Sequence, residues 1–260
     1  MFEFQFFLIG VIQGVTEFLP ISSSGHLVLF GKLTNWEDQG LFTDIAVHFG
    51  TLFAVMIYLR KDIYYLLTNI LQFKIYEDQI IFKIILSTLP AILLGYFIYD
   101  YVSLYFRSIQ LIAFSSIVFA IILYFADKIK MQNKNWKNIT YTEALIVGLF
   151  QVLAFIPGAS RAGVTITGAR FLSFNRSDAT KFSMLLSIPI ILASLFMSLL
   201  DYYIADEPIL NFYSSVFAAF VAFITALLSI TLMMKIIKIA NFNVFIIYRI
   251  LLGVLILMFV

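Results

Sequence analysis

The chain has 260 residues, of which 62% are apolar or aromatic and only 12% are Asp, Glu, Lys or Arg. Soluble domains carry roughly 25% charged residues, so the composition excludes a soluble enzyme, a disordered chain and a coiled coil. The net charge of +2 gives no reason to expect a nucleic-acid partner. The absence of cysteine excludes disulfides and thiolate metal sites. We therefore expect an all-α polytopic membrane protein.

The chain begins with an interrupted apolar segment, 4–30, whose centre reads FLPISSSGH. Proline removes a backbone donor, and the freed backbone groups need protein or water partners, so this segment cannot be one unbroken lipid-facing helix. The first 31 residues contain no Lys or Arg, so we expect no secretory signal and a segment that stays in the mature protein. A second interrupted segment, 141–168, has FIPGASRAG at its centre.

Six uninterrupted apolar stretches are each long enough to cross a bilayer as a helix. They are 44–60, 80–100, 109–126, 181–200, 211–234 and 243–260. Most of the Lys and Arg residues fall in alternate connections, and placing these connections in the cytoplasm lets six crossings alternate without conflict. The sequence therefore predicts six transmembrane helices, both termini outside, and two re-entrant segments that enter from opposite sides.

The two interrupted segments resemble each other. Gly10, Gln13, Phe18, Pro20 and Ser23 align with Gly148, Gln151, Phe155, Pro157 and Ser160 when one residue is deleted before the phenylalanine. Each segment precedes three crossings, so tandem copies must have opposite orientations. We expect one membrane domain over 1–260, formed by an inverted repeat of 1–130 and 138–260 whose broken helices meet near the midplane.

Ionisable side chains inside membrane segments are costly and are the first candidates for function. Glu17 and His26 lie in the first interrupted segment and Arg161 in the second. Ser23 stands three residues before His26, close enough for the hydroxyl to meet the imidazole across one helical turn. Gln13 stands four residues before Glu17, so a helix places both on one face. If the segments meet, we expect Arg161 and its neighbour Ser160 to face this group.

This combination suits phosphoryl transfer, in which positioning and charge neutralisation do most of the work. A hydroxyl beside an imidazole supplies a nucleophile and a proton acceptor. An arginine fork with hydroxyl and backbone N–H groups suits phosphate oxygens, and the Glu17 carboxylate suits a hard cation. Structural roles compete with this interpretation, since a Glu–Arg pair or a serine trio also stabilises helix packing. For Arg249, in the last crossing, we expect a tertiary partner.

Two long motifs carry a resemblance to a known family. GVIQGVTEFLPISSSGHLVLFG (10–31) and PGASRAGVT (157–165) resemble the two signatures of the undecaprenyl-diphosphate phosphatase family, also called the bacitracin-resistance family. DIAVHFGTLFAVMIYLRKD (44–62) and FSMLLSIPIILAS (182–194) are similar to the same family, so the resemblance covers essentially the full chain.

The resemblance implies hydrolysis of the terminal phosphate of undecaprenyl diphosphate, a polyprenyl diphosphate lipid, to recycle the carrier for peptidoglycan synthesis. It also implies bacitracin resistance, a place in the bacterial inner membrane, an active site that faces the extracytoplasmic side, and a divalent cation such as Mg or Ca. Homo-oligomer formation is left open.

Carried over by position, the resemblance implies that the family's catalytic residues fall on Gln13, Glu17, Ser23, His26, Ser160 and Arg161, with Thr165 completing the second motif. From these residues and their neighbours we expect two sets of site residues. The catalytic set is Ser23, His26, Glu17 and Arg161, with Glu17 also the metal ligand. The substrate-binding set is Gln13, Ser22, Ser24, Gly25, Gly158, Ser160, Gly163 and Thr165. Two positions depart from the family pattern. Gln13 replaces the first acidic residue, which rules out a two-carboxylate metal site from this pair, and Ala162 replaces a usual serine.

For the mechanism we expect Ser23 to attack the terminal phosphorus and to pass its proton to His26, which then activates water. His26 as nucleophile is the second alternative and direct attack by water the third. Among other functions, an acid-phosphatase-like lipid phosphatase would need an Arg-Pro motif, and none of the five prolines follows an arginine. A transporter shares the inverted-repeat architecture, but it has no evident need for Ser and His opposite an Arg.

Overall fold

The computed structural model of the chain describes residues 2–34, 36, 39–71, 79–105, 108–132, 134–205 and 211–259. Within these ranges every regular element is a helix. The first half contains α1 (Phe2–Thr16), α2 (Ser23–Thr34), α3 (Leu41–Tyr58), α4 (Arg60–Leu71), α6 (Ile80–Tyr105) and α7 (Ile109–Lys128). The second half contains the 3-10 turn η1 (Trp136–Asn138), α8 (Tyr141–Val152), the 3-10 turn η2 (Leu153–Phe155), α9 (Arg161–Phe171), α10 (Arg176–Ala205), α11 (Phe212–Ile239) and α12 (Asn243–Phe259).

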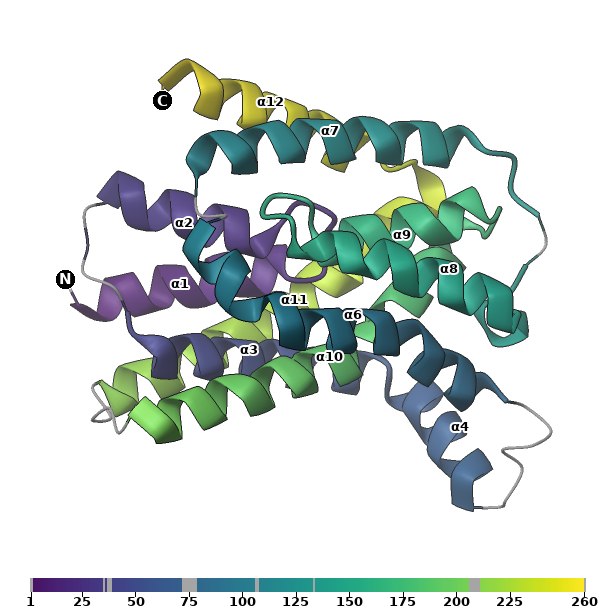
Figure 1. The fold of residues 1–260 in the computed structure, drawn as a ribbon, viewed down its shortest axis with the longest axis horizontal. Coiled ribbons are helices and arrows are strands. Elements are labelled where there is room, and N and C mark those ends of the chain that lie inside the picture. The colour runs from purple at the N-terminus through teal and green to yellow at the C-terminus, as the bar shows by residue number, and fades with distance from the viewer. Residues whose placement is uncertain are drawn as a thin grey trace.

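Both predicted interruptions are present, and each forms a helical hairpin. The first hairpin consists of α1 and α2, and the second of α8 and α9 (Figure 1). The two hairpins point toward each other along the long axis of the molecule, so that their turns meet near its middle (Figure 1). The second hairpin starts at a capping box, in which Thr140 and Glu143 satisfy each other's backbone N–H groups.

Among the described residues, five helices, α3, α6, α7, α10 and α11, are long and apolar enough to cross a membrane, which makes the chain a multi-pass membrane protein. The sixth predicted crossing corresponds to α12, which has 17 residues and a length of about 25 Å. This is a few ångströms short of a bilayer core of about 30 Å, so the count of six crossings stays a prediction. The helix α4 was not anticipated, because it lies in a charged connection and buries none of its residues.

The two halves pack crosswise. Helix α1 packs on α11 of the other half and α8 packs on α6, while α7 packs on α12 and α3 on α10. Two aligned glycines permit the first two contacts. A Cβ at Gly10 would lie 2.5 Å from the carbonyl oxygen of Ala218, and one at Gly148 would lie 2.6 Å from that of Ser87. Such exchanged contacts are compatible with an inverted repeat, which stays a prediction.

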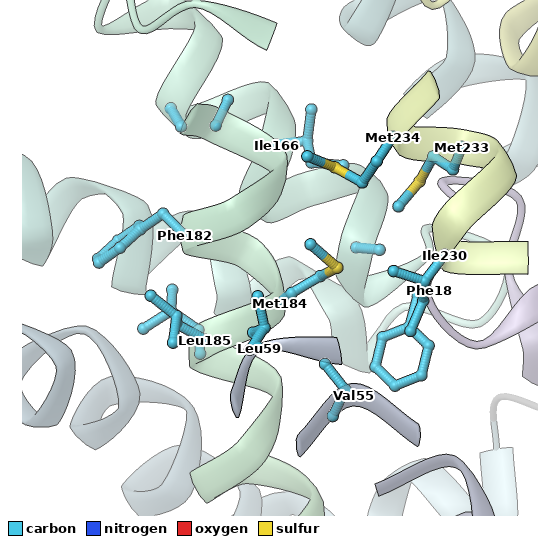
Figure 2. Packing of buried hydrophobic residues seen from close by; sticks show 14 of the residues in the cluster. Phe18, Val55, Leu59, Ile166, Phe182, Met184, Leu185, Ile230, Met233 and Met234 are labelled. Atoms are coloured by element: carbon cyan, nitrogen blue, oxygen red, sulfur yellow. The ribbon is translucent and has the colours of Figure 1, made fainter. Parts of the chain in front are cut away.

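The main apolar core lies beside the hairpin turns. Side chains of α3, α10 and α11 converge there with Ile166 of α9 and with Phe18 of the first turn (Figure 2). Phe18 is 1% exposed, so the turn that carries the neighbouring polar residues is itself packed into the core. The core therefore fixes the position of the first turn relative to α3, α10 and α11, and with it the place where the two turns meet.

Contacts between charged residues gather the basic connections at one end of the molecule. Lys181 lies 3.0 Å from Asp62, and Arg176 lies 2.8 Å from Asp127. The ammonium of Lys137 lies 3.6 Å from the ring centroid of Tyr65. Helix α1 begins and α12 ends at the opposite end (Figure 1). The charge segregation expected from the sequence is thus present in three dimensions.

Candidate active site

Glu17, in the turn after α1, accepts hydrogen bonds from both hairpins. Its Oε2 accepts from Gln13 Nε2 at 2.8 Å and from Ser23 Oγ at 3.0 Å, while Oε1 pairs with Arg161 Nη2 at 2.8 Å. The side chains of Glu17 and Arg161 are 8% and 13% exposed. The structure therefore brings together four residues that the sequence selected, and one ion pair joins residues 144 positions apart.

Arg161 is the first residue of α9, and its guanidinium lies over the ring of Phe18, 5.7 Å from the centroid. Its Nη2 is bound to Glu17, whereas its Nη1 is buried and has no hydrogen-bond partner among the described residues. Buried polar atoms are nearly always paired. An unpaired guanidinium N–H in a polar turn is therefore a donor that an anion such as a phosphate oxygen can accept.

His26 makes two hydrogen bonds, one from each ring nitrogen. Nδ1 lies 2.7 Å from the carbonyl oxygen of Ser22, which can only accept, so Nδ1 carries the proton. Nε2 is then the acceptor, and the hydroxyl of Tyr248 donates to it at 2.6 Å. The expected contact between Ser23 and His26 is not made, because the Ser23 proton is directed to Glu17 and both ring nitrogens have other partners.

The two hairpin turns have the same local geometry, which corrects the alignment of the repeat. Ser22 and Ser160 each precede a helix with positive φ, 73° and 70°. Each hydroxyl accepts from the backbone N–H three residues on, at 3.4 Å from Gly25 and 3.1 Å from Gly163. Ser160 therefore corresponds to Ser22 and not to Ser23. The structural counterpart of Ser23 is Arg161, so the two residues that bind Glu17 occupy equivalent helix starts.

Arg249 of α12 connects the two turns. It is fully buried, and its guanidinium donates to the carbonyl oxygens of Pro20 at 3.3 Å, of Gly158 at 2.9 Å and of Ala159 at 3.0 Å. These bonds confirm the expected tertiary role. Gly158 was predicted to bind substrate. In the structure its φ is +91°, and a Cβ would lie 2.4 Å from the carbonyl oxygen of Ile112, so Gly158 serves the close packing of the second turn on α7.

The remaining predicted residues occupy supporting positions. Ser160 caps α9 and reaches the carbonyl oxygen of Leu19 at 3.4 Å. Thr165 is fully buried and shares a 2.6 Å hydrogen bond with Ser183 of α10. The backbone N–H groups of Gly25 and Gly163 donate to the capping serines. The side chain of Ser24 lies outside the described residues.

A divalent cation would find one carboxylate at this site. No group of three or more His, Cys, Asp or Glu residues gathers anywhere in the described part of the chain. The amide oxygen of Gln13 is buried and without a partner among the same residues, and Gln13 adjoins Glu17. Carboxylate and amide oxygens are ligands that Mg and Ca accept. The two residues therefore fit a cation whose remaining ligands are phosphate oxygens and water.

Sequence reasoning missed Tyr248 and the polar residues that hold the second hairpin. The hydroxyl of Ser115 on α7 donates to the carbonyl oxygen of Pro157, and Asp127 binds the fully buried Arg170 at 3.2 Å. A single tyrosine on an apolar span carries no signal of its own. Its place beside Arg249, the intramembrane charge already noted, was the available clue.

Comparison with known proteins matches the chain to a family model and to a curated relative. The family model described as bacitracin resistance protein BacA matches residues 6–255. A protein of Aliivibrio salmonicida (strain LFI1238) named undecaprenyl-diphosphatase is 42% identical over 260 residues, which cover 97% of this chain and 96% of that protein. Both matches span the two hairpins and the helices between them.

Proposed function

The chain belongs to the bacitracin resistance protein BacA family, and we infer from this membership and from the 42% identity that it is an undecaprenyl-diphosphatase. It hydrolyses undecaprenyl diphosphate, a lipid substrate, to undecaprenyl phosphate and inorganic phosphate. The observation that carries the assignment of the site is the pair of Glu17 and Arg161, which joins the two hairpins and leaves Nη1 of the guanidinium unpaired among the described residues.

We propose that Arg161 binds the terminal phosphate and that Ser23 attacks it. A nucleophile and its base need to be in hydrogen-bond contact, and Ser23 Oγ donates to Glu17 at 3.0 Å. Ser23 Oγ forms a bond to the terminal phosphorus, and its proton passes to Glu17 Oε2. The bond between that phosphorus and the bridging oxygen breaks, and undecaprenyl phosphate leaves. Glu17 thus takes the role of proton acceptor that we expected for His26.

The second step returns the enzyme to its starting state. Water attacks the phosphoserine, and His26 Nε2 takes a proton from it, since Nδ1–H is held on the Ser22 carbonyl. The bond between phosphorus and Ser23 Oγ breaks, Oγ recovers its proton from Glu17, and phosphate leaves. The imidazolium then returns its proton to solvent.

A bound Mg or Ca ion would neutralise negative charge on the diphosphate. Glu17 and the amide oxygen of Gln13 are the residues that would hold it together with phosphate oxygens. We expect a chelator to stop turnover of the purified enzyme and added Mg or Ca to restore it.

For the membrane arrangement we propose six crossings, with α12 the sixth, and two re-entrant hairpins that belong to repeats 1–130 and 138–260. We place the protein in the bacterial inner membrane with its site open to the extracytoplasmic side, where it recycles the peptidoglycan carrier and supports bacitracin resistance. The gathering of basic residues at one end supports this orientation.

Single cysteines at Asn211 and Lys130 test the orientation, because an impermeant thiol reagent should label only the first in intact cells. The reverse pattern would overturn the orientation.

The test of the proposed function is phosphate release from undecaprenyl diphosphate by the purified protein. Removing one preorganised donor from a developing negative charge costs about 10²–10³ in rate, so Arg161→Ala should be nearly inactive. Arg161→Lys keeps the charge but loses the two-pronged geometry and should be intermediate. Arg60→Lys, at an exposed position, is the matched control. Wild-type turnover by folded Arg161→Ala would refute the role of Arg161.

Terminally labelled substrate distinguishes the nucleophiles. We expect label on Ser23 in a rapidly quenched wild-type sample and no covalent label in Ser23→Ala. Label recovered on His26 of Ser23→Ala would make His26 the nucleophile.

A further inference from the structure

A single side-chain contact joins His26 of the first hairpin to Tyr248 of α12, 222 residues further along the chain. The tyrosine hydroxyl lies 2.6 Å from Nε2, and the two rings are nearly parallel, with an interplanar angle of 5° and centroids 5.7 Å apart. His26 is half-buried and Tyr248 is 42% exposed. The contact therefore lies at the edge of the site and not within the packed core.

The protonation of the imidazole determines which group donates in this hydrogen bond. Because the Ser22 carbonyl holds Nδ1–H, Nε2 is the ring's one basic nitrogen. The Tyr248 hydroxyl donates its proton to that nitrogen and so occupies the position that a reacting water would need. A half-exposed hydroxyl can exchange partners when a phosphate or a water enters, whereas the Nδ1 contact, which is part-buried and made to the backbone, stays in place.

The neighbouring residue fixes the tyrosine relative to the site. Arg249 binds carbonyl oxygens of both hairpin turns, so the turn of α12 that carries Tyr248 is tied to Pro20, Gly158 and Ala159. The Tyr248 hydroxyl consequently has a defined position with respect to the turns that carry Glu17 and Arg161. A tyrosine elsewhere on α12 would lack this reference.

We propose that Tyr248 is a positioning residue for His26: in the tautomer that the Ser22 carbonyl sets, its hydroxyl donates to Nε2, fixes the ring orientation, and covers Nε2 until substrate enters. The proposal rests on the proposed function in using Nε2 as the base of the second step. The hydrogen bond itself does not depend on turnover, and the two can therefore be tested apart.

The chain has only two histidines, which makes the contact measurable without substrate. Diethyl pyrocarbonate acylates an unprotonated ring nitrogen that is free to react, so in a His48→Gln background His26 is the sole reporter. Loss of one neutral hydrogen bond should raise the acylation rate of His26 about fivefold in Tyr248→Phe, which keeps the ring. Tyr213→Phe, at an 88% exposed tyrosine, is the matched control and should change the rate by less than about twofold. His26→Asn in the same background gives the baseline.

Turnover supplies the second measurement. Because the hydroxyl orients a group that acts after substrate has bound, Tyr248→Phe should lower kcat about fivefold and leave KM within about twofold. An unchanged acylation rate, or a change in KM alone, would overturn the proposal. If acylation rises while the wild-type protein releases no phosphate from undecaprenyl diphosphate, the hydrogen bond stands and the proposed function fails.

Discussion

Helix α9 of the second hairpin is enclosed by the rest of the molecule, whereas α2 of the first hairpin is only partly covered. In α9 every residue from Ala162 to Arg170 is buried, and Thr165 is bonded to α10. In α2 the residues from His26 to Phe30 are all half-buried, and His26 itself is bonded to the exposed Tyr248. Segments with fewer buried contacts open at lower free energy. The difference indicates that α9 presents Arg161 on a rigid support, while α2 carries Ser23 and His26 on a more mobile one.

The proposed catalytic residues are also distributed unequally between the two hairpins. In the first hairpin Gln13 binds the carboxylate of Glu17, while its counterpart Gln151 binds the backbone carbonyl of Ser87. The proposed nucleophile Ser23 and the base His26 thus lie on the partly covered α2, Glu17 lies in the turn between α1 and α2, and the enclosed α9 supplies the cation, Arg161. A lipid substrate needs an opening by which to reach the site, and the partly covered side of α2 provides the less costly route.

The largest expected effect comes from the polar contact that fixes the far end of α9. Asp127 accepts from the fully buried Arg170 and from Arg176, so Asp127→Asn leaves a buried cation without its counter-charge. We expect the free energy of unfolding to fall by about 3–5 kcal/mol, measured by thermal denaturation in detergent. Asp62→Asn breaks the more exposed pair with Lys181 and should cost about 0–1 kcal/mol. Equal losses of unfolding free energy in the two variants would mean that the contacts of Asp127 stabilise the second hairpin no more than an exposed ion pair does.

Arg249→Lys tests whether α12 aligns the two turns. A lysine cannot donate in three fixed directions, so the turn carbonyls of Pro20, Gly158 and Ala159 lose partners. A displacement of about 1 Å costs on the order of 10²-fold in rate, which is the loss of kcat that we expect. Hydrogen exchange should accelerate in the turn 17–22 and remain slow in α9. Faster exchange in both hairpins would show that the second is not the rigid one.

Much of this arrangement was predictable from the sequence, and the errors have identifiable causes. Proline, glycine and charge are visible in the chain, so the two breaks and the basic end were found. The Ser23–His26 pairing was wrong because side chains at the start of a helix lean back toward its N-terminus, which directs Ser23 to Glu17. Three of the partners of Arg249 are backbone carbonyls, which have no sequence signature.

Two equivalent glycines allow a matched comparison of the hairpins. A Cβ at Gly163 would lie 2.9 Å from Arg249 Nη1 and 3.2 Å from Ser160 Cβ, whereas one at Gly25 would meet nothing closer than Ile112 Cγ2 at 3.2 Å. Overpacking costs about 1–3 kcal/mol, so Gly163→Ala should lower both thermal stability and phosphate release, by displacing Arg249. Gly25→Ala should gain some helix propensity and change stability by less than about 1 kcal/mol. A larger loss of stability in Gly25→Ala than in Gly163→Ala would show that the first hairpin, and not the second, is the more tightly packed there.

The smallest expected effect concerns the two serines that precede α2 and α9. Both have positive φ, 73° at Ser22 and 70° at Ser160, which costs a residue with a Cβ about 1–2 kcal/mol and costs glycine nothing. Glycine in place of a capping serine loses only a few tenths of a kcal/mol, and its greater freedom in the unfolded chain costs about 0.5–1 kcal/mol more. Ser22→Gly, whose cap is the longer one at 3.4 Å, should therefore leave the free energy of unfolding unchanged or raise it by about 0.5 kcal/mol.

Ser160→Gly loses the 3.1 Å cap and the contact with the Leu19 carbonyl, so we expect its free energy of unfolding to be about 0.5 kcal/mol below that of Ser22→Gly. The alanine variants keep the backbone strain and lose the cap, and each should be less stable than the matching glycine variant by about 1 kcal/mol. Thermal denaturation of the four variants measures these differences. Alanine and glycine variants of equal stability would show that the positive φ is not maintained at that turn, and such a result at Ser22 alone would strengthen the view that the first hairpin is the mobile one.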